Sequence, residues 1–410
     1  MHNQAPKGRY DVWVPLFCLD RALEDEDLML TSRRILACMA FLVPAAGLSG
    51  FAVIMARKIV KRGTKDYRRA EVTEDGRRIR IDLDDYTKAP GGFGVFDPAT
   101  EKYTGVGEVT LINEDQKYVE RRIDPPGSAP GRLGPIVDWT PDVFFEPSAV
   151  GGRYEEVDVP TAYGAAPAWL FEGNTDVWVI HIHGSWTDRS IMFRDVHAFS
   201  SLGFTSLVPT FRSDPEVSPP QAESSHLGLT EWRDVESAVT YAVAHGARRI
   251  ILSGWSMGGT IALLTAERSA HRDRIVGIVL VGPVTSWRKT ITAGAARAGV
   301  PAIGAGLVMC LLQTPPFAKM LGLEEPIDFN VLDWVDVPNR VEVPTLVLHS
   351  KADQEVPWEI SAAFQRANPA TVTLIPLPEA HHTQEWNASP STFTNELTSW
   401  ISKTILTEQG

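Results

Sequence analysis

The run Gly254-Trp255-Ser256-Met257-Gly258-Gly259 decides the fold of this chain of 410 residues. It follows an apolar, β-branched stretch that is typical of a buried strand, and it opens a stretch with helical periodicity. A G-x-S-x-G motif requires this strand–turn–helix context, because the serine takes a strained backbone conformation and its neighbours Gly254 and Gly258 must lack bulk. The helix dipole would point its positive end at the serine oxygen. The sequence therefore predicts that Ser256 is an exposed nucleophile.

Short apolar strands alternate with helices on both sides of this turn. Such alternation indicates a parallel sheet that is covered by helices on both faces. We therefore predict an α/β fold with a mostly parallel sheet in a domain at residues 166–405. The strands are expected at 177–183, at a run ending at 209, and at 250–252, 275–281, 345–349 and 372–377, with helices at 231–244 and 257–270.

Two later segments supply partners for Ser256. A serine hydroxyl is a poor nucleophile until a base removes its proton, and in this type of motif the base follows a carboxylate along the chain. Asp353 lies in a turn just after one predicted strand, and His381 and His382 lie in a loop after the next. No other acid in this region sits just beyond a strand end. The rival acids are Asp328, Asp333, Asp336 and Glu355.

With these residues in place, the chain resembles the α/β-hydrolase superfamily over about residues 166–405. Within it, the chain is most similar to the serine aminopeptidase and prolyl-oligopeptidase-like hydrolases, including bacterial members carried on an N-terminal membrane helix. His183-Gly184 matches the strand end that leads into the family's oxyanion loop, and Val356-Pro357 follows the predicted carboxylate as in the family. The pair Trp386-Asn387 selects His382 as the matching histidine.

The chain departs from the family pattern at two positions. Ser185-Trp186 follows His183-Gly184, where lipase-type oxyanion loops carry further glycines. His381 stands where a glycine is commoner. These departures leave the substrate open.

The resemblance implies a two-step acyl transfer. Ser256 would attack a carbonyl carbon, His382 would take the proton and return it to the leaving group, and Asp353 would orient the imidazole. The backbone amides of Met257 and Ser185 would receive the oxyanion. The pKa of His382 is expected at about 6 to 7.5, because the carboxylate raises it and burial lowers it. Residues expected to border the substrate pocket are Trp186, Trp255, Arg212 and His226.

The stretch 287–336 separates two predicted core strands and is longer than a normal connection. In this superfamily that position carries a lid. Residues 300–312 are apolar, which suggests a lid over an apolar acyl or side-chain pocket, although simple packing of the insert on the core would give the same pattern.

Residues 35–56 contain no charge and are long enough to cross a bilayer as one helix. We predict a tail at 1–34, a transmembrane helix at 35–56, and a small β-rich accessory region at 57–165. Seven flanking Lys and Arg residues follow the helix and three precede it, which weakly favours a cytoplasmic catalytic domain at the cell membrane. Ser32-Arg33-Arg34 resembles a twin-arginine signal, so cleaved export stays an alternative.

Composition narrows the function further. A formal charge of −12 gives no electrostatic reason to bind nucleic acid, and three distant cysteines do not form a zinc site. His181 and His183 resemble a metal pair but lack a third ligand at suitable spacing, and no phosphate loop implies a cofactor. We therefore predict a serine hydrolase that takes an ester, thioester, amide, acyl compound or short peptide without a metal or cofactor. A peptidase, an acyltransferase and a non-catalytic binding protein remain alternatives.

Overall fold

The structure is a computed structural model that describes residues 50–63, 65, 67–124, 133–212, 214, 216–217 and 224–407. The chain divides after Ile54, and the features below lie in the unit Met55–Gly410 unless stated otherwise.

The predicted transmembrane helix at 35–56 lies for the most part outside the described residues, as does the predicted tail at 1–34. Residues 50–60 are helical. Across the described parts of the chain, no helix is both long enough and apolar enough to span a bilayer.

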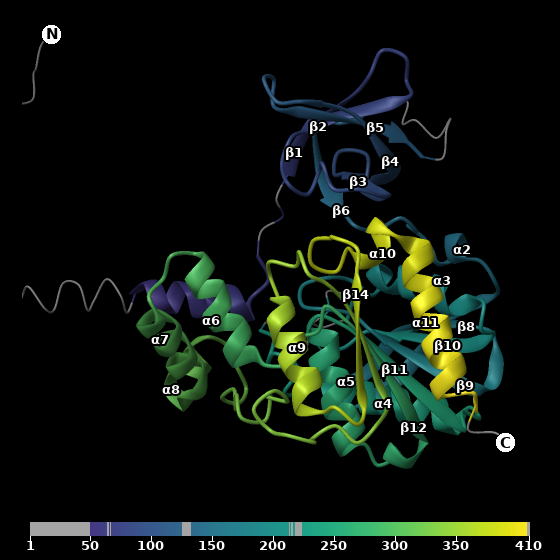
Figure 1. The fold of residues 1–410 in the computed structure, drawn as a ribbon, viewed down its shortest axis with the longest axis vertical. Coiled ribbons are helices and arrows are strands. Elements are labelled where there is room, and N and C mark those ends of the chain that lie inside the picture. The colour runs from purple at the N-terminus through teal and green to yellow at the C-terminus, as the bar shows by residue number, and fades with distance from the viewer. Residues whose placement is uncertain are drawn as a thin grey trace, which may run out of the picture. The chain divides into compact units, whose positions relative to one another are not determined.

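An eight-stranded sheet forms the centre of the larger domain, with the strand order β14-β13-β12-β11-β9-β10-β8-β7 (Figure 1). The six strands from β14 to β10 are parallel, and β8 and β7 extend the sheet as an antiparallel edge. The strands are β7 (Tyr154–Thr161), β8 (Gly164–Phe171), β9 (Asn174–Ile182), β10 (Phe204–Pro209), β11 (Arg249–Trp255), β12 (Ile275–Val281), β13 (Thr345–Ser350) and β14 (Val372–Leu377). The mostly parallel sheet is confirmed.

The sheet begins earlier than the predicted boundary at residue 166. Strand β7 and the start of β8 precede that position, and β8 pairs antiparallel with both β7 and β10. β7 is mostly exposed and carries charged side chains, so its sequence does not look like that of a buried parallel strand.

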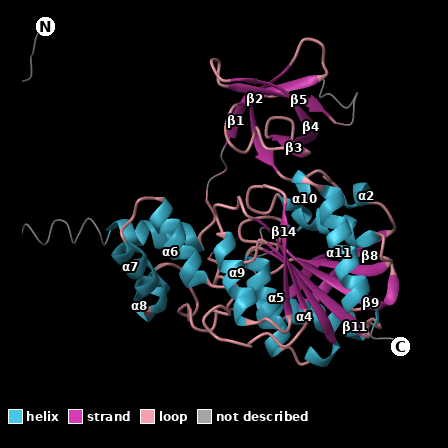
Figure 2. Cartoon of the chain, in the orientation of Figure 1, coloured by secondary structure: helices cyan, strands magenta, loops and turns pink. Residues whose placement is uncertain are grey.

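Helices cover both faces of the sheet (Figure 2). α3 (Phe193–Ser200) and α11 (Pro390–Thr404) pack on one face, and α4 (Trp232–Ala244), α5 (Met257–Arg268) and α9 (Trp358–Ala367) pack on the other. The apolar stripe of α4 is buried, as helical periodicity predicts. The shorter helices are α2 (Pro147–Val150), α10 (Glu385–Ala388) and the 3₁₀ turns Arg189–Met192 and Arg272–Arg274.

The insert between β12 and β13 is helical. It contains α6 (Trp287–Arg297), α7 (Ala302–Gln313) and α8 (Pro315–Met320), inside the range 287–336 that the sequence marks out. Its outer surface exposes Ile303, Phe317 and Met320.

The β-rich region before the sheet closes into a barrel with the order β1-β2-β5-β4-β3-β6. Its strands are β1 (Tyr67–Val72), β2 (Arg78–Asp82), β3 (Phe93–Asp97), β4 (Lys102–Asn113), β5 (Tyr118–Ile123) and β6 (Ile136–Thr140). Alternate side chains fill its interior, among them Ile79, Phe93 and Val119. The buried Arg121 donates to the carbonyls of Gly107, Thr87, Ala89 and Gly91.

Candidate active site

Ser256 lies at the sharp turn between β11 and α5. Its φ of 55° and ψ of −118° are strained for a residue with a side chain. The glycines on either side make this turn possible. A Cβ at Gly254 would lie 2.3 Å from the carbonyl oxygen of Gly258, and one at Gly258 would lie 2.1 Å from the carbonyl oxygen of Ile182.

Two other loops bring His382 and Asp353 to this serine. Nε2 of His382 lies 2.8 Å from Oγ of Ser256, and Nδ1 of His382 lies 2.6 Å from Oδ2 of Asp353. Asp353 follows β13 and His382 follows β14, so both come from the same edge of the sheet as Ser256. With its proton on Nδ1 toward the carboxylate, the imidazole leaves Nε2 free to accept the serine proton.

The neighbouring His381 has a different environment. Its Nε2 lies 2.8 Å from the carbonyl oxygen of Asp85 in the barrel, and its ring packs against Tyr86 with 4.5 Å between centroids. Of the two histidines, only His382 is in contact with Ser256.

Asp353 is almost fully hydrogen-bonded. Oδ1 accepts from the backbone amides of Glu355 and Val356 at 2.8 and 3.0 Å, and Oδ2 contacts His382 and His349. Burial raises the pKa of Asp353, but hydrogen bonds from His349 and His382 outweigh it and hold that pKa well below the usual range. The carboxylate therefore stays ionised at neutral pH.

Burial lowers the pKa of His382, but the hydrogen bond and charge of Asp353 outweigh it, and the nearby Glu355 and Glu385 add to the increase. Together they raise the pKa of His382 to about 9. This value lies above the range of about 6 to 7.5 expected from the sequence, because two further carboxylates lie close to the imidazole.

The predicted oxyanion segment runs directly against the nucleophile. A Cβ at Gly184 would lie 3.1 Å from Cβ of Ser256, so only a glycine fits there without displacement. Ser185 follows, and its Oγ contacts Sδ of Met257 at 3.1 Å. The segment that carries Ser185 and the N-terminus of α5 at Met257 thus meet beside Ser256. Trp186 has a φ of 62°, a strained value for a tryptophan.

The buried imidazole of His183 contacts this oxyanion segment at Gly184. Nδ1 lies 2.9 Å from the carbonyl oxygen of Gly184, and Nε2 lies 2.9 Å from Oδ2 of Asp214. Burial lowers the pKa of His183, but the Asp214 carboxylate and the Gly184 carbonyl raise it overall. Because both ring nitrogens face acceptors, the imidazolium form satisfies both contacts.

A cavity of about 360 Å³ adjoins Ser256 and His382. Trp186 and Trp255 line it, and Trp287 and Thr290 of the insert form part of its wall. The remaining lining residues are Lys58, Ile59, Gly184, Ser185, Thr187, Ile191, Val284, Glu355, Val356 and Thr383. The wall is mainly apolar, with the charged groups at Lys58 and Glu355.

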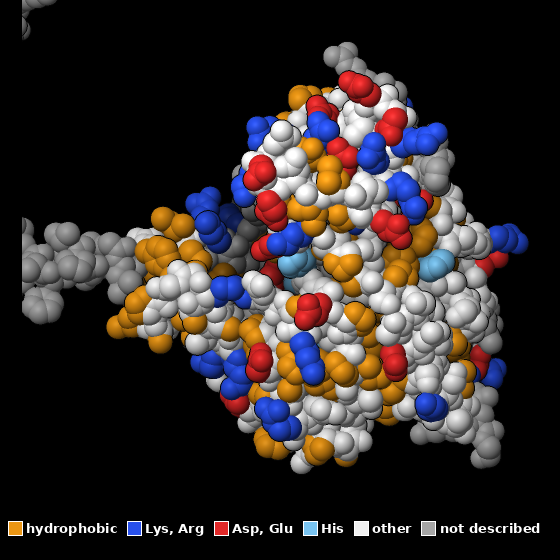
Figure 3. Space-filling view, turned by 45° about the horizontal axis from the view of Figure 1, so that its top comes forward, with side chains coloured by type: hydrophobic (Ala, Val, Ile, Leu, Met, Phe, Trp, Pro, Cys, Tyr) orange, Lys and Arg blue, Asp and Glu red, His pale blue; other side chains and the backbone are white. Residues whose placement is uncertain are grey.

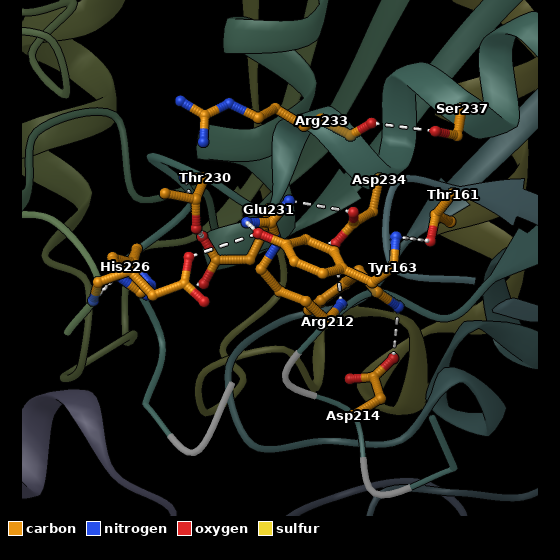
Figure 4. Close-up of polar contacts among 12 residues, drawn as sticks. Thr161, Tyr163, Arg212, Asp214, His226, Thr230, Glu231, Arg233, Asp234 and Ser237 are labelled. Carbon is orange, nitrogen blue, oxygen red and sulfur yellow. Dashed lines mark hydrogen bonds and ion pairs between the residues drawn. The ribbon is translucent and has the colours of Figure 1, made fainter. Parts of the chain in front are cut away.

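Arg212 and His226 occupy other places, contrary to the sequence expectation (Figure 4). Arg212 is buried and forms a two-pronged ion pair with Asp234, with its guanidinium stacked on Tyr163. His226 is buried, and its Nε2 accepts from the backbone amide of Glu324. Neither is among the described residues that line the cavity. A polar residue just after a strand can form a buried structural contact as readily as it can line a substrate site.

The two histidines considered as a metal pair have separate partners. His181 binds Asp195 at 2.7 Å and His183 binds Asp214. In the part of the chain that the structure describes, one group has metal-ligand spacing, namely His349, Asp353 and Glu385. Nε2 of His349 already binds Oδ2 of Asp353, so these two side chains hold each other in place without a cation.

Sequence reasoning missed three residues around His382. His349, near the end of β13, belongs to no motif that points to a role, but its Nε2 lies 3.0 Å from Oδ2 of Asp353. Glu385 is buried close to the imidazole. Arg194 donates to the carbonyl of Thr383 and to Asn387. These contacts connect α3 to the segment that follows His382. Nothing in the local sequence of Arg194 indicates this contact.

Comparisons with known proteins agree with this geometry. The alpha/beta hydrolase family matches residues 179–395, which is more than half of the chain, and the chain therefore belongs to that family. A comparison with curated protein sequences gives no match.

Two solved structures are similar to this chain, and the first of them shows a shared fold. An esterase from Pyrococcus furiosus is 20% identical with a TM-score of 0.50, over 64% of this chain and 95% of that one. A thermophilic esterase from Thermogutta terrifontis is 21% identical with a TM-score of 0.43, over 61% of this chain and 99% of that one.

Proposed function

We propose that the protein is a serine hydrolase that cleaves carboxylic esters or thioesters through a covalent acyl-enzyme. The observation that carries this proposal is the continuous hydrogen-bonded chain from Oγ of Ser256 through both ring nitrogens of His382 to Oδ2 of Asp353, at 2.8 and 2.6 Å. A nucleophile, a base and an orienting acid in this order are the parts that acyl transfer requires.

In the first step, Oγ of Ser256 attacks the carbonyl carbon as Nε2 of His382 removes its proton. The carbonyl π bond opens onto oxygen, and the amides of Ser185 and Met257 would stabilise that oxyanion. Collapse of the intermediate breaks the bond to the leaving group, which takes the proton from His382. Water, deprotonated by the same imidazole, then cleaves the serine ester and releases the acid. Throughout, Asp353 holds the tautomer and stabilises the imidazolium.

The insert 287–336 acts in this proposal as a lid over an acyl group. Trp287 and Thr290 line the cavity beside Ser256, and Ile59, Ile191 and Val284 make its wall apolar. An apolar wall on the nucleophile side favours an acyl chain over a charged peptide terminus. This feature favours the esterase reading over the peptidase alternative.

We also propose that residues 35–56 anchor the protein in the cell membrane. The apolar sequence of this segment supports the proposal, and the two residues Lys58 and Ile59, just beyond it, line the cavity. The proposed anchor is therefore followed in the chain, after Arg57, by two residues of the cavity wall.

The test is labelling of the purified full-length protein with a fluorophosphonate probe, followed by turnover of p-nitrophenyl esters and aminoacyl amides. We expect labelling and ester turnover, both lost in Ser256→Ala. Ser237→Ala, at a half-buried position on α4 away from the cavity, is the matched control and should behave as the wild type. Labelling of Ser256→Ala at the wild-type rate, or turnover of the amides alone, would contradict the ester assignment.

A further inference from the structure

A second cavity of about 580 Å³ opens beside the catalytic pocket, between the barrel and the α/β domain. Figure 3 shows a hollow on this face, with Lys, Arg, Asp and Glu side chains gathered around it and a histidine at its edge. The two cavities adjoin each other and share six lining residues. These are Trp186, Thr187, Ile191, Glu355, His382 and Thr383.

Hydrogen bonds attach the barrel to the segment that carries His381, His382 and Asn387. The barrel side of the cavity wall is therefore held in place. Nδ2 of Asn387 donates to the carbonyls of Gly92 and Pro141 at 2.6 and 2.7 Å. His381 contacts the carbonyl of Asp85. The fit is tight, since a Cβ at Gly91 would lie only 1.8 Å from the carbonyl oxygen of Asn387.

The position of His382 tells which part of a substrate would lie in the second cavity. His382 lines both cavities, whereas Ser256 lines only the first. In acyl transfer the imidazole passes its proton to the leaving group, while the acyl carbon is bonded to the serine. The cavity that reaches His382 but not Ser256 is therefore placed for the leaving group.

The walls of this cavity combine aromatic rings with charges of both signs. Tyr103 is about four-tenths exposed, and its ring stacks on Phe145 at 4.8 Å and 13°. Tyr86 and Phe96 add further rings. The charges are largely paired, as in Lys65 with Asp138 at 2.9 Å.

Further polar contacts come from both domains. Arg62 pairs with Asp188 at 3.1 Å, and the hydroxyl of Tyr86 donates to Glu355 at 3.3 Å. Paired charges of this kind offer hydrogen-bond donors and acceptors without a strong net field.

Asp142 also lines this cavity, and its Oδ2 accepts from the hydroxyl of Thr140 at 2.8 Å. Its Oδ1 is enclosed by the protein, so a bound molecule does not reach it. The hydrogen-bonding groups open to a bound molecule are those of the exposed ion pairs, among them Asp188, whose side chain is 46% exposed.

We propose that this cavity is the leaving-group site, and that the barrel selects esters of alcohols carrying several hydroxyl groups, such as a sugar or glycerol head group. Hydroxyl groups donate and accept, which suits the exposed pair Arg62 and Asp188, and the C–H face of such an alcohol suits the ring of Tyr103. This proposal rests on the proposed ester hydrolysis. It assigns the barrel a part in specificity and leaves the chemistry to Ser256.

The experiment compares three esters that share one acyl group: butyryl glucose, monobutyryl glycerol and ethyl butyrate. We expect wild-type kcat/KM to be about tenfold higher for at least one polyol ester than for ethyl butyrate. The sugar and glycerol arms show which head group is preferred. Tyr103→Ala and Asp188→Asn should each reduce that preference about threefold to tenfold, the size expected for one lost contact. Turnover of ethyl butyrate should fall less than that of the polyol esters, because its leaving group carries no further hydroxyl group.

Controls separate this effect from damage to the fold. Tyr103→Phe keeps the ring and should lose only part of the preference. Tyr118→Ala, on the barrel strand β5 and outside the cavity lining, should lose none. Equal rates for all three wild-type esters, or equal losses on all three in the Tyr103 and Asp188 variants, would overturn the proposal. Failure of the wild type to hydrolyse any ester would instead defeat the proposed function itself.

Discussion

His349 binds the same oxygen of Asp353 that holds the imidazole of His382. Nε2 of His349 lies 3.0 Å from Oδ2 of Asp353, while Nδ1 of His349 contacts Oγ of Ser361 at 2.8 Å. The hydroxyl of Ser361 can donate to Nδ1, which leaves Nε2–H directed at the carboxylate. His349 is thus a positioning residue that acts through Asp353.

We therefore expect His349→Ala to lower kcat about tenfold, with little change in KM, because Asp353 loses one of its donors and is held less firmly. His349→Gln should restore much of the loss, since its amide can still donate. Steady-state kinetics on one ester gives both constants. If the Ala and Gln variants lost activity equally, a packing role would explain the residue better.

The adjacent histidines should differ sharply. His382→Ala is expected to lose at least about a thousandfold in kcat, as members of such triads do. His381→Ala removes only the contacts with Asp85 and Tyr86 and should lose much less. Both rates are measured on the same p-nitrophenyl ester, and losses of similar size would contradict the assignment of His382 as the base.

The rate of ester hydrolysis should rise with pH, with a midpoint near the raised pKa of His382. His382 must be neutral to accept the serine proton, and the pKa of His382 is raised to about 9, above its ordinary value of about 6.5. Activity is therefore low where the imidazole is protonated and grows as the pH passes that pKa. A kcat/KM profile from pH 5 to 10 on a neutral ester checks this.

The charge of Glu355 provides the matched comparison. It contributes to the raised pKa of His382, so Glu355→Gln should move the midpoint toward lower pH while the polar contact with Tyr86 is kept. An unchanged or higher midpoint in this variant would argue against the electrostatic explanation.

The sequence predicts the centre of the sheet and the nucleophile turn well because their signals are local. The strands 275–281 and 372–377 are found with the predicted bounds, since each is an apolar run between turn residues. The strain at Ser256 follows from the glycines around it, which stand within two residues of it.

The rest depends on contacts between distant segments. Closure of the barrel requires β1 to pair with β6, about seventy residues away, and nothing in either strand names its partner. The approach of the barrel to His382 depends in turn on Asn387 and His381. Arg212 looked like a site residue because it follows a strand, and only the three-dimensional structure shows its pairing with Asp234.

Steric limits at the nucleophile turn give a stability test. Gly258→Ala would place a Cβ 2.1 Å from the carbonyl oxygen of Ile182, a backbone atom that cannot move cheaply. We expect loss of activity and a fall in Tm, measured by thermal unfolding. Gly294→Ala in α6 is the control, because no atom lies within 4 Å of the added Cβ. It should be neutral or stabilising by up to about 1 kcal/mol, and a similar Tm for both variants would refute the argument.

The last prediction concerns the proposed anchor at residues 35–56 and the residues that directly follow it. If residues 35–56 are an anchor, the full-length protein should sediment with membranes and resist carbonate extraction, and a chain beginning at Met55 should not. The shortened chain should keep its activity because it retains Lys58 and Ile59, which line the catalytic cavity.

A chain beginning at Lys65 should be less stable and less active. It lacks both lining residues and the buried Val60, whose carbonyl accepts from the amide of Ser225 at 2.8 Å. Burial of one valine contributes about 1.5 to 3 kcal/mol, enough to be seen in a denaturant titration. Carbonate-extractable full-length protein would contradict the anchor, and full activity of the chain from Lys65 would contradict the role of residues 58–60 in the pocket wall.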